Sequence, residues 1–314
     1  GTRTYQQRYP VAGSPNAQVE LYILAPQQPA APPVRVDLGA ETDVYIARVD
    51  WSPDGSTLYV QRQNRAQTEL DMLAVDPLTG SSRLLFQEKA AQRSWINLSD
   101  SYRFLTDGRL LWWSERDGFG HLYLYSTGEW QQLTQGEWVV TGLVGVDESA
   151  GRIFFTGTRD NVLEQHVYSL SLDQPQQIER LSEHGFTHAA EMDEQGQALM
   201  VSRSSSDQPP QSYLADASGS RLAWIEENRL DASHPYAPYL ASHRATSFGD
   251  LKAADGTQLH WMMITPEMEP GKRYPVFFQH YGGPHAQQVT NRWHGAQPQA
   301  IVDRGFIYFE LDNR

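Results

Sequence analysis

The sequence contains no cysteine, which excludes disulfide bonds, cysteine zinc sites and a thiolate nucleophile. It also lacks any run of about 18 apolar residues, so no membrane-spanning helix is predicted. Positive charge is scarce, because 25 Lys and Arg stand against 38 Asp and Glu and give a net charge of −13. Such a chain lacks the basic surface that neutralises nucleic-acid phosphates, and it is repelled by anionic membranes. We therefore expect a soluble protein that binds neither nucleic acid nor membranes.

Several catalytic motifs are also missing. The chain has no Gly-x-Ser-x-Gly nucleophile elbow, no P-loop, no His-Glu-x-x-His and no Gly-x-Gly-x-x-Gly. His184 and His188 are four residues apart with acidic neighbours, but their segment indicates a turn that enters a strand rather than a helix. We interpret them as exposed polar loop residues. The sequence thus predicts neither a metal site nor a cofactor.

The residues that are abundant indicate β structure. The chain has 15 Tyr, 9 Trp and 11 Phe, and aromatic side chains pack well on pleated sheets. It also has 24 Gly and 18 Pro, which punctuate turns, whereas helical periodicity is hard to find before residue 285. The composition predicts a mainly β fold.

A strand–turn–strand unit recurs along the chain. Its turn glycines, at positions 55, 108, 151 and 196, are spaced by 53, 43 and 45 residues. Further strands of alternating polarity follow the turns, at Leu70–Val75, Ser82–Phe86, His121–Tyr125, Trp130–Leu133, His166–Leu170 and Ser212–Ala215. Repeats of about 40 to 50 residues with four antiparallel strands are typical of propeller blades. A β-sandwich with irregular hairpins is the alternative, but four copies in phase favour the propeller.

The repeats stop near residue 240. Ahead of the first full copy, Gln18–Leu24 and Val34–Leu38 indicate most of another blade, and His234–Tyr239 is a proline-punctuated linker. We therefore predict an incomplete β-propeller of about four to five blades over residues 1–240.

The remaining residues, 241–314, have a different pattern. The apolar run Val276–His280 predicts a central strand of a parallel sheet. A helix over residues 294–304, capped by Gly305, and a second apolar strand at Phe306–Phe309 follow. Strand, crossover and strand predict the beginning of an α/β domain.

Tyr281 is the main candidate site residue. Tyr281-Gly282-Gly283-Pro284 directly follows the first apolar strand, which places the tyrosine at the carboxyl end of a parallel strand, where α/β sheets bind ligands. The glycines allow a sharp turn, and a phenol there can donate a hydrogen bond to a developing oxyanion. A plain strand-to-loop turn with a packed tyrosine is the alternative that the residues alone leave open.

Three sets of residues carry a further signal: Arg8–Asn16 with Val19–Leu21; Trp95–Leu98 with Arg103–Gly108, Trp113–Phe119 and His121–Tyr123; and Tyr274–Pro284 with Gln287. Together they resemble the bacterial dipeptidyl peptidase IV branch of the prolyl oligopeptidase family. They follow one another in the family's order and cover nearly the whole chain. The first two are fairly specific for this branch, whereas the Tyr-Gly-Gly-Pro turn is shared more widely.

The resemblance implies an eight-bladed propeller that caps an α/β-hydrolase domain. Such an enzyme releases N-terminal dipeptides with Pro or Ala at the second position, using a Ser-His-Asp triad and no cofactor. Tyr281 would be an oxyanion-hole donor, and Pro284 and Gln288 would contact the substrate nearby. The implied partners are peptides with a free N-terminus, and the intact protein would be a homodimer. The sequence leaves the compartment open between the bacterial periplasm and the cytoplasm.

The resemblance also implies that essential parts lie outside these residues. The family's serine, aspartate and histidine come after Arg314, and its paired glutamates, which grip the substrate N-terminus, come before Gly1. The apolar strand at Phe306–Phe309 lies only a few residues before Arg314. We therefore expect a fragment that is truncated before the catalytic serine and is inactive alone.

Two other interpretations stay open at this point. A related prolyl oligopeptidase or acylaminoacyl peptidase would share the fold and triad but lack the paired glutamates. A propeller that serves only as a protein-binding platform would be of another class. The Tyr281–Pro284 turn and the α/β opening speak against the platform, which needs neither.

Overall fold

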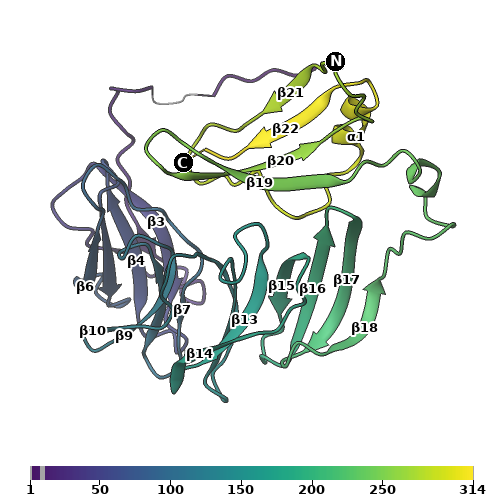
Figure 1. Ribbon diagram of the computed structural model, residues 1–314. Coiled ribbons are helices and arrows are strands. Elements are labelled where there is room, and N and C mark those ends of the chain that lie inside the picture. Colours follow the sequence, from purple (N-terminus) through teal and green to yellow (C-terminus); the bar gives the residue numbers. More distant parts are fainter. Residues whose placement is uncertain (1, 8–10, 314) are drawn as a thin grey trace. The chain divides into compact units, whose positions relative to one another are not determined.

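The computed structural model describes residues 2–7 and 11–313. Arg8–Pro10, part of a run that carries the resemblance, lies outside the described residues, as do Gly1 and Arg314. The chain forms two compact units, Gly1–Gln132 and Leu133–Arg314, in which four-stranded sheets predominate (Figure 1). In the part of the chain that is described, no helix combines the length and apolarity needed to cross a bilayer.

The described residues of the first unit form one two-stranded and two four-stranded antiparallel sheets. The short sheet pairs β1 (Tyr22–Ile23) with β2 (Val34–Arg35). The other two consist of β3 (Val44–Trp51), β4 (Leu58–Asn64), β5 (Glu69–Val75) and β6 (Ser82–Lys89), and of β7 (Arg103–Phe104), β8 (Leu110–Ser114), β9 (His121–Ser126) and β10 (Glu129–Gln132).

The second unit begins with two further four-stranded antiparallel sheets. A short 3-10 helix at Ala237–Tyr239 follows them. The sheets consist of β11 (Val140–Asp147), β12 (Arg152–Gly157), β13 (His166–Ser171) and β14 (Gln174–Arg180), and of β15 (Thr187–Met192), β16 (Ala198–Ser205), β17 (Gln208–Asp216) and β18 (Arg221–Glu226).

The predicted repeat is confirmed. Gly55, Gly108, Gly151 and Gly196 each lie in the turn between the first and second strand of a four-stranded sheet, with φ of 70°, 86°, 62° and 73°. This left-handed region is open to glycine without strain. Strands within each sheet pair in chain order, as in propeller blades. The fold is an incomplete β-propeller followed by a mixed sheet.

Apolar side chains of neighbouring blade sheets pack against each other. In the first unit, Met72 of β5 and Trp112 of β8 belong to one buried cluster. In the second unit, Leu199 and Tyr213 form a cluster against which Val144 and Met192 pack. The inner strands supply contacts on both faces because apolar residues occupy both: in β5, Met72 belongs to the cluster with Trp112 and Leu73 belongs to another.

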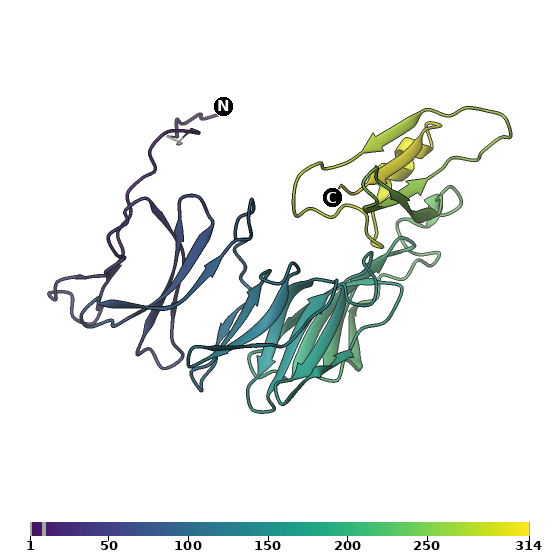
Figure 2. The same ribbon diagram turned by 60° about the vertical axis from the view of Figure 1, so that its left-hand side comes forward.

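The mixed sheet follows the linker. It contains β19 (Thr246–Lys252), β20 (Gln258–Ile264), β21 (Val276–Gln279) and β22 (Ile307–Leu311) in the order β19-β20-β22-β21, with β21 and β22 parallel. α1 (Ala296–Val302) connects those two strands and lies against the sheet in both views (Figures 1 and 2).

The helix is shorter than predicted. Gly295 has φ of 72°, outside the helical region, so α1 begins at Ala296 rather than at residue 294. The helix also ends before the predicted residue 304, because Asp303 rather than Gly305 is its C-cap. Gly305, with φ of 84°, lies in the turn that follows and donates its N–H to the Val302 carbonyl.

The apolar strand predicted at Val276–His280 is present as β21 and is parallel to β22. Within the described residues β21 pairs only with β22, which lies between β20 and β21, and Val276, Phe277 and Phe278 are 55%, 41% and 52% exposed. A central place for β21 in a larger parallel sheet stays a prediction. The domain boundary at residue 241 stays a prediction.

Candidate functional site

Tyr281 lies on the loop that follows β21. Gly282 has φ of 73°, and a Cβ atom on Gly283 would lie 2.5 Å from Cε1 of Tyr281. The left-handed backbone at Gly282 favours glycine, and the backbone at Gly283 lies close to the tyrosine ring. Tyr281 is 63% exposed, so its phenol is accessible to a ligand.

The end of β22 holds this loop in place. The carboxylate of Asp312 accepts hydrogen bonds from the backbone N–H groups of Gln288, at 2.6 Å, and Val289, at 3.2 Å. The Asn313 amide donates to the Gly283 carbonyl at 3.3 Å. The carboxyl ends of two neighbouring parallel strands thus carry one connected loop, at the position where α/β sheets bind ligands.

The structure places the three predicted site residues on this single loop. Tyr281 and Pro284 are exposed, whereas Gln288 is partly buried and is held through its backbone. Their assigned roles stay predictions. Asp312 was missed, although it follows an apolar strand just as Tyr281 does, and the same rule identifies it.

Asn291 is a second residue that the sequence did not reveal. It lies at the far end of the same loop and makes five hydrogen bonds to segments of the two preceding sheets. Its Nδ2 donates to Glu164 Oε1 at 3.0 Å and to the Gly185 carbonyl at 3.2 Å, its Oδ1 accepts from the Ser206 N–H at 3.1 Å, its backbone N–H donates to the Leu163 carbonyl at 2.7 Å, and its carbonyl accepts from Thr187 Oγ1 at 2.9 Å.

The carboxylate that Asn291 contacts belongs to a buried network. Glu164 Oε2 also accepts from the Gly185 N–H at 3.1 Å and lies 3.0 Å from His166 Nε2. His166 Nδ1 lies 3.1 Å from the Ser182 hydroxyl. Glu164, His166 and Ser182 are all buried, so these hydrogen bonds replace the water that the groups lose on folding.

The histidines of this region differ from expectation. His188 is only 1% exposed and lies in β15, so the interpretation of His184 and His188 as exposed loop residues is correct for His184 and wrong for His188. Burial, reinforced by the neighbouring His166, lowers the pKa of His188 to about 3. Burial also lowers the pKa of His166, although Glu164 opposes this. Both imidazoles are therefore neutral at pH 7.

Glu164, His166 and His184 have ligand atoms within 4.8 Å of one another, as in a metal site. Their contacts favour another use. Both ring nitrogens of His166 already have partners, and the Arg180 guanidinium lies against the ring of His184. A fixed positive charge at that position opposes cation binding. The group is therefore a hydrogen-bond network.

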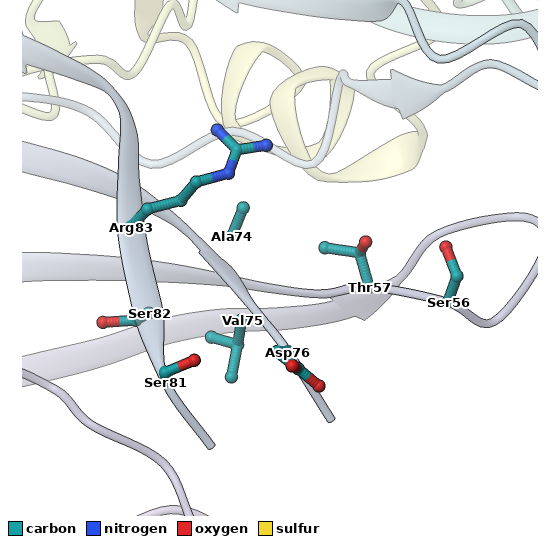
Figure 3. Close-up of a pocket in the computed structure, with 8 residues that line it drawn as sticks. All are labelled: Ser56, Thr57, Ala74, Val75, Asp76, Ser81, Ser82 and Arg83. Atoms are coloured by element: carbon teal, nitrogen blue, oxygen red, sulfur yellow. The ribbon is translucent and has the colours of Figure 1, made fainter. Parts of the chain in front are cut away.

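A shallow hollow of about 270 Å³ lies in the first unit (Figure 3). Arg83 and Asp76 line it together with short hydroxyl side chains such as Thr57 and Ser82. These groups belong to one blade sheet and to its turns. None of the predicted site residues lies there.

Comparison with known proteins identifies the family. The family model described as the dipeptidyl peptidase IV N-terminal region matches residues 2–210. A dipeptidyl peptidase 4 of Arthroderma otae is 28% identical and is matched over 99% of this chain, and one of Trichophyton rubrum is 27% identical over the same share. The chain spans about 42% of the length of these curated relatives.

Solved structures agree with this match. The structure of Porphyromonas gingivalis dipeptidyl peptidase 4 superimposes with a TM-score of 0.89 at 24% identity, over 98% of this chain and 43% of the other. A Bacteroides ovatus protein described as a candidate dipeptidyl aminopeptidase IV gives a TM-score of 0.84 at 27% identity, over 98% of this chain and 46% of its own.

Proposed function

The chain belongs to the family of the dipeptidyl peptidase IV N-terminal region, and we propose that it is part of a serine exopeptidase that releases dipeptides from peptide N-termini. Relatives named dipeptidyl peptidase 4 support a peptidase parent, and the position of Tyr281 carries the proposal within the chain. The preferred substrates are peptides with a free N-terminus and Pro or Ala at the second position. The parent would have an eight-bladed propeller over residues that include 1–240, an α/β-hydrolase domain that begins near residue 241, and a homodimeric assembly.

Tyr281 would act on the reacting carbonyl. A serine attack on a peptide carbonyl places negative charge on its oxygen, and a neutral phenol can donate a hydrogen bond to that oxygen. Gly282 and Gly283 support this role because they keep the backbone close to the ring and leave the phenol exposed. Pro284 and Gln288 would line the same side of the substrate.

Residues 1–314 lack a Gly-x-Ser-x-Gly elbow, so we propose that this chain alone has no peptidase activity. A Gly-Pro-chromophore substrate tests both proposals. We expect no hydrolysis by the 314-residue chain, and hydrolysis together with labelling by a fluorophosphonate in the full-length protein. Labelling without dipeptide release would favour a prolyl oligopeptidase or acylaminoacyl peptidase, and absence of labelling would favour a binding platform.

The role of Tyr281 is tested in the full-length protein with Tyr281→Phe. Loss of one oxyanion donor lowers kcat by about 100- to 1000-fold while KM changes little. Tyr274→Phe is the matched control, because Tyr274 donates to the Glu267 carbonyl, away from the loop. An unchanged kcat in Tyr281→Phe would overturn the assignment.

A further inference from the structure

The loop from Tyr281 to Asn291 is fixed to two different parts of the second unit. Asp312, in the mixed sheet, holds the backbone of Gln288 and Val289. The segment between β12 and β13 holds the loop from the other side, because the Gln287 amide donates to the Val162 carbonyl at 2.8 Å and Asn291 contacts Leu163 and Glu164. The blade segment between β12 and β13 thus binds the loop and fixes its position.

The apolar contacts follow the polar ones. Val289 is fully buried in the core of the mixed sheet, together with Met262 and Tyr308, and Leu163 from the blade packs against the same cluster. The backbone contact of Leu163 and the side-chain contact of Glu164, both with Asn291, are therefore continuous with this apolar contact. Together they form one junction between the blade segment and the loop.

The donors and acceptors at this junction permit one arrangement. Because the Glu164 carboxylate offers acceptors only, neutral His166 carries its proton on Nε2. Its Nδ1 therefore accepts from the Ser182 hydroxyl, whose oxygen accepts from the Val167 N–H at 2.9 Å. Neutral His166 then donates from Nε2 to Glu164 Oε2, where the Gly185 N–H also donates. Oε1 remains as the acceptor for the Asn291 amide.

The Asn291 amide is oriented independently of Glu164. Its oxygen accepts from the Ser206 N–H, and its nitrogen also donates to the Gly185 carbonyl. A carboxylate offers acceptors only, and a buried acceptor that loses its donor costs more than the bond itself contributes. The pair is therefore specific to glutamate on one side and to an amide on the other.

We propose that the Glu164–Asn291 hydrogen bond is a positioning contact, through which the last two blade sheets fix the loop that presents Tyr281. The catalytic part of this inference rests on the proposed function, whereas the structural part does not. Neither residue touches the reacting atoms. Their effect is transmitted through the backbone of residues 287–291 to Asp312, which binds the Gln288 N–H. It then reaches the Gly283 carbonyl, which accepts a hydrogen bond from the neighbouring Asn313.

Three variants test the contact by exchanging donor and acceptor. Asn291→Asp removes the amide donor and sets two carboxylates against each other. Glu164→Gln leaves two unfavourable orientations. Either the new amide nitrogen faces the Asn291 amide nitrogen, or it faces the Gly185 N–H, which then lacks its acceptor. When Glu164→Gln and Asn291→Asp are combined, the new amide at position 164 can donate to the new carboxylate at position 291. The oxygen of that amide can still accept from His166 and Gly185.

Hydrogen exchange of the 314-residue chain is the first measurement, because it needs no peptidase activity. We expect each single substitution to speed exchange of the amides of residues 287–293 by about 10- to 100-fold. In the double variant, the amides of residues 287–293 should exchange more slowly than the product of the two single effects predicts. Unchanged exchange in Asn291→Asp, or purely multiplicative effects in the double variant, would overturn the contact.

The matched control makes the same change elsewhere. Asn97 donates to Glu115 at 2.6 Å in the first unit, so Asn97→Asp also sets a carboxylate against a glutamate. We expect it to leave the exchange of residues 287–293 unchanged. Faster exchange of that segment in the control would attribute the effect to general destabilisation and would overturn the proposal.

The full-length enzyme provides the second measurement. Misplacement of a catalytic loop lowers kcat more than it raises KM, and we expect about a tenfold or larger loss of kcat in Asn291→Asp with partial recovery in the double variant. If the full-length protein cleaves no dipeptide, the proposed function fails while the exchange result still stands. If exchange changes and kcat does not, the positioning role is overturned.

Discussion

The two compact units hold their buried polar groups by different chemistry. Nine of the ten histidines lie in the second unit, Leu133–Arg314, and only His121 lies in the first. In the first unit, partly buried carboxylates are held by permanent donors, such as Arg62 on Asp71 and the Trp112 indole on Glu88. Arginine and tryptophan keep these donors throughout the range in which histidine titrates.

This difference predicts different responses to acid. Burial lowers the pKa of His166, His188, His243 and His294, and all four lie in the second unit. A histidine that is neutral in the fold takes up a proton when the chain unfolds. The second unit should therefore lose stability in mildly acidic solution, whereas the first should not.

The units can be followed separately through methionine oxidation. Met72 in the first unit and Met262 in the second are both 0% exposed, so each reacts with peroxide only when its own unit opens. The urea dependence of each oxidation rate reports the free energy of unfolding of one unit.

The largest effect is expected for His188. Its pKa is about 3 in the fold, against 6.5 for the free side chain, so stability falls as the pH drops from 6.5 towards 3. The limit of this loss is roughly 4 to 5 kcal/mol. His188→Leu should remove this part of the acid sensitivity of Met262 oxidation and change the stability at pH 7 by less than about 1.5 kcal/mol. An unaltered acid profile in His188→Leu would contradict the assignment.

The ion pair between Arg62 and Asp71 gives the next effect, now in the first unit. Both side chains are largely buried, and Asp71 also accepts from Gln87 at 2.7 Å. Asp71→Asn leaves the guanidinium without its counter-charge, and we expect a loss of about 2 to 3 kcal/mol. The urea dependence of Met72 oxidation should therefore move to lower urea concentrations. The loss in the free energy of unfolding that it reports should be the same at pH 7 and pH 5. A loss that grows on acidification would break the contrast between the units.

A smaller effect is expected at Tyr102. Its hydroxyl donates to Asp50 at 2.6 Å, and burial together with that carboxylate raises the pKa of the phenol. Tyr102→Phe should cost about 1 kcal/mol, because the partly exposed carboxylate can turn to water. Phe104→Tyr is the matched control, because it changes one hydroxyl group in the same aromatic cluster without removing a native hydrogen bond. A cost near zero in Tyr102→Phe would show that solvent fully replaces this donor.

The smallest effect is expected at the Asp54 turn. Hydrogen bonds from the Ser52 hydroxyl and the Ser56 N–H lower the pKa of this exposed carboxyl to about 2. Its contribution is complete above pH 3.8 and is lost as the pH falls towards 2. Asp54→Asn should thus alter the acid profile of Met72 oxidation only below about pH 4. A change near pH 6 would place an unrecognised titrating group in the first unit.

The repeats could be predicted from the sequence because their signals are local. A glycine turn between two strands of alternating polarity lies within about 15 residues, and Gly55, Gly108, Gly151 and Gly196 all mark such turns in the structure. The Tyr281 loop was also predictable, since a glycine pair after an apolar strand is a local pattern. By contrast, apolar residues alone do not distinguish an edge strand from a central one, so the neighbours of β21 could not be predicted from its sequence.

The network around Glu164 could not be predicted, since its partners are distant in the chain. Asn291 is 127 positions from Glu164, and nothing in either local sequence indicates the other. His188 was misjudged for the same reason. Its burial depends on His166 and Phe186, which pack against it, and not on the polarity of its immediate neighbours.

The separation between Glu164 and Asn291 has a consequence for synthesis. A ribosome that adds about 5 to 20 residues per second makes Asn291 roughly 6 to 25 seconds after Glu164. During that interval the β11–β14 sheet can form, but one oxygen of its Glu164 carboxylate lacks its amide donor. The junction is therefore a late event in folding, and the nascent chain carries an acceptor that only its own later residues satisfy.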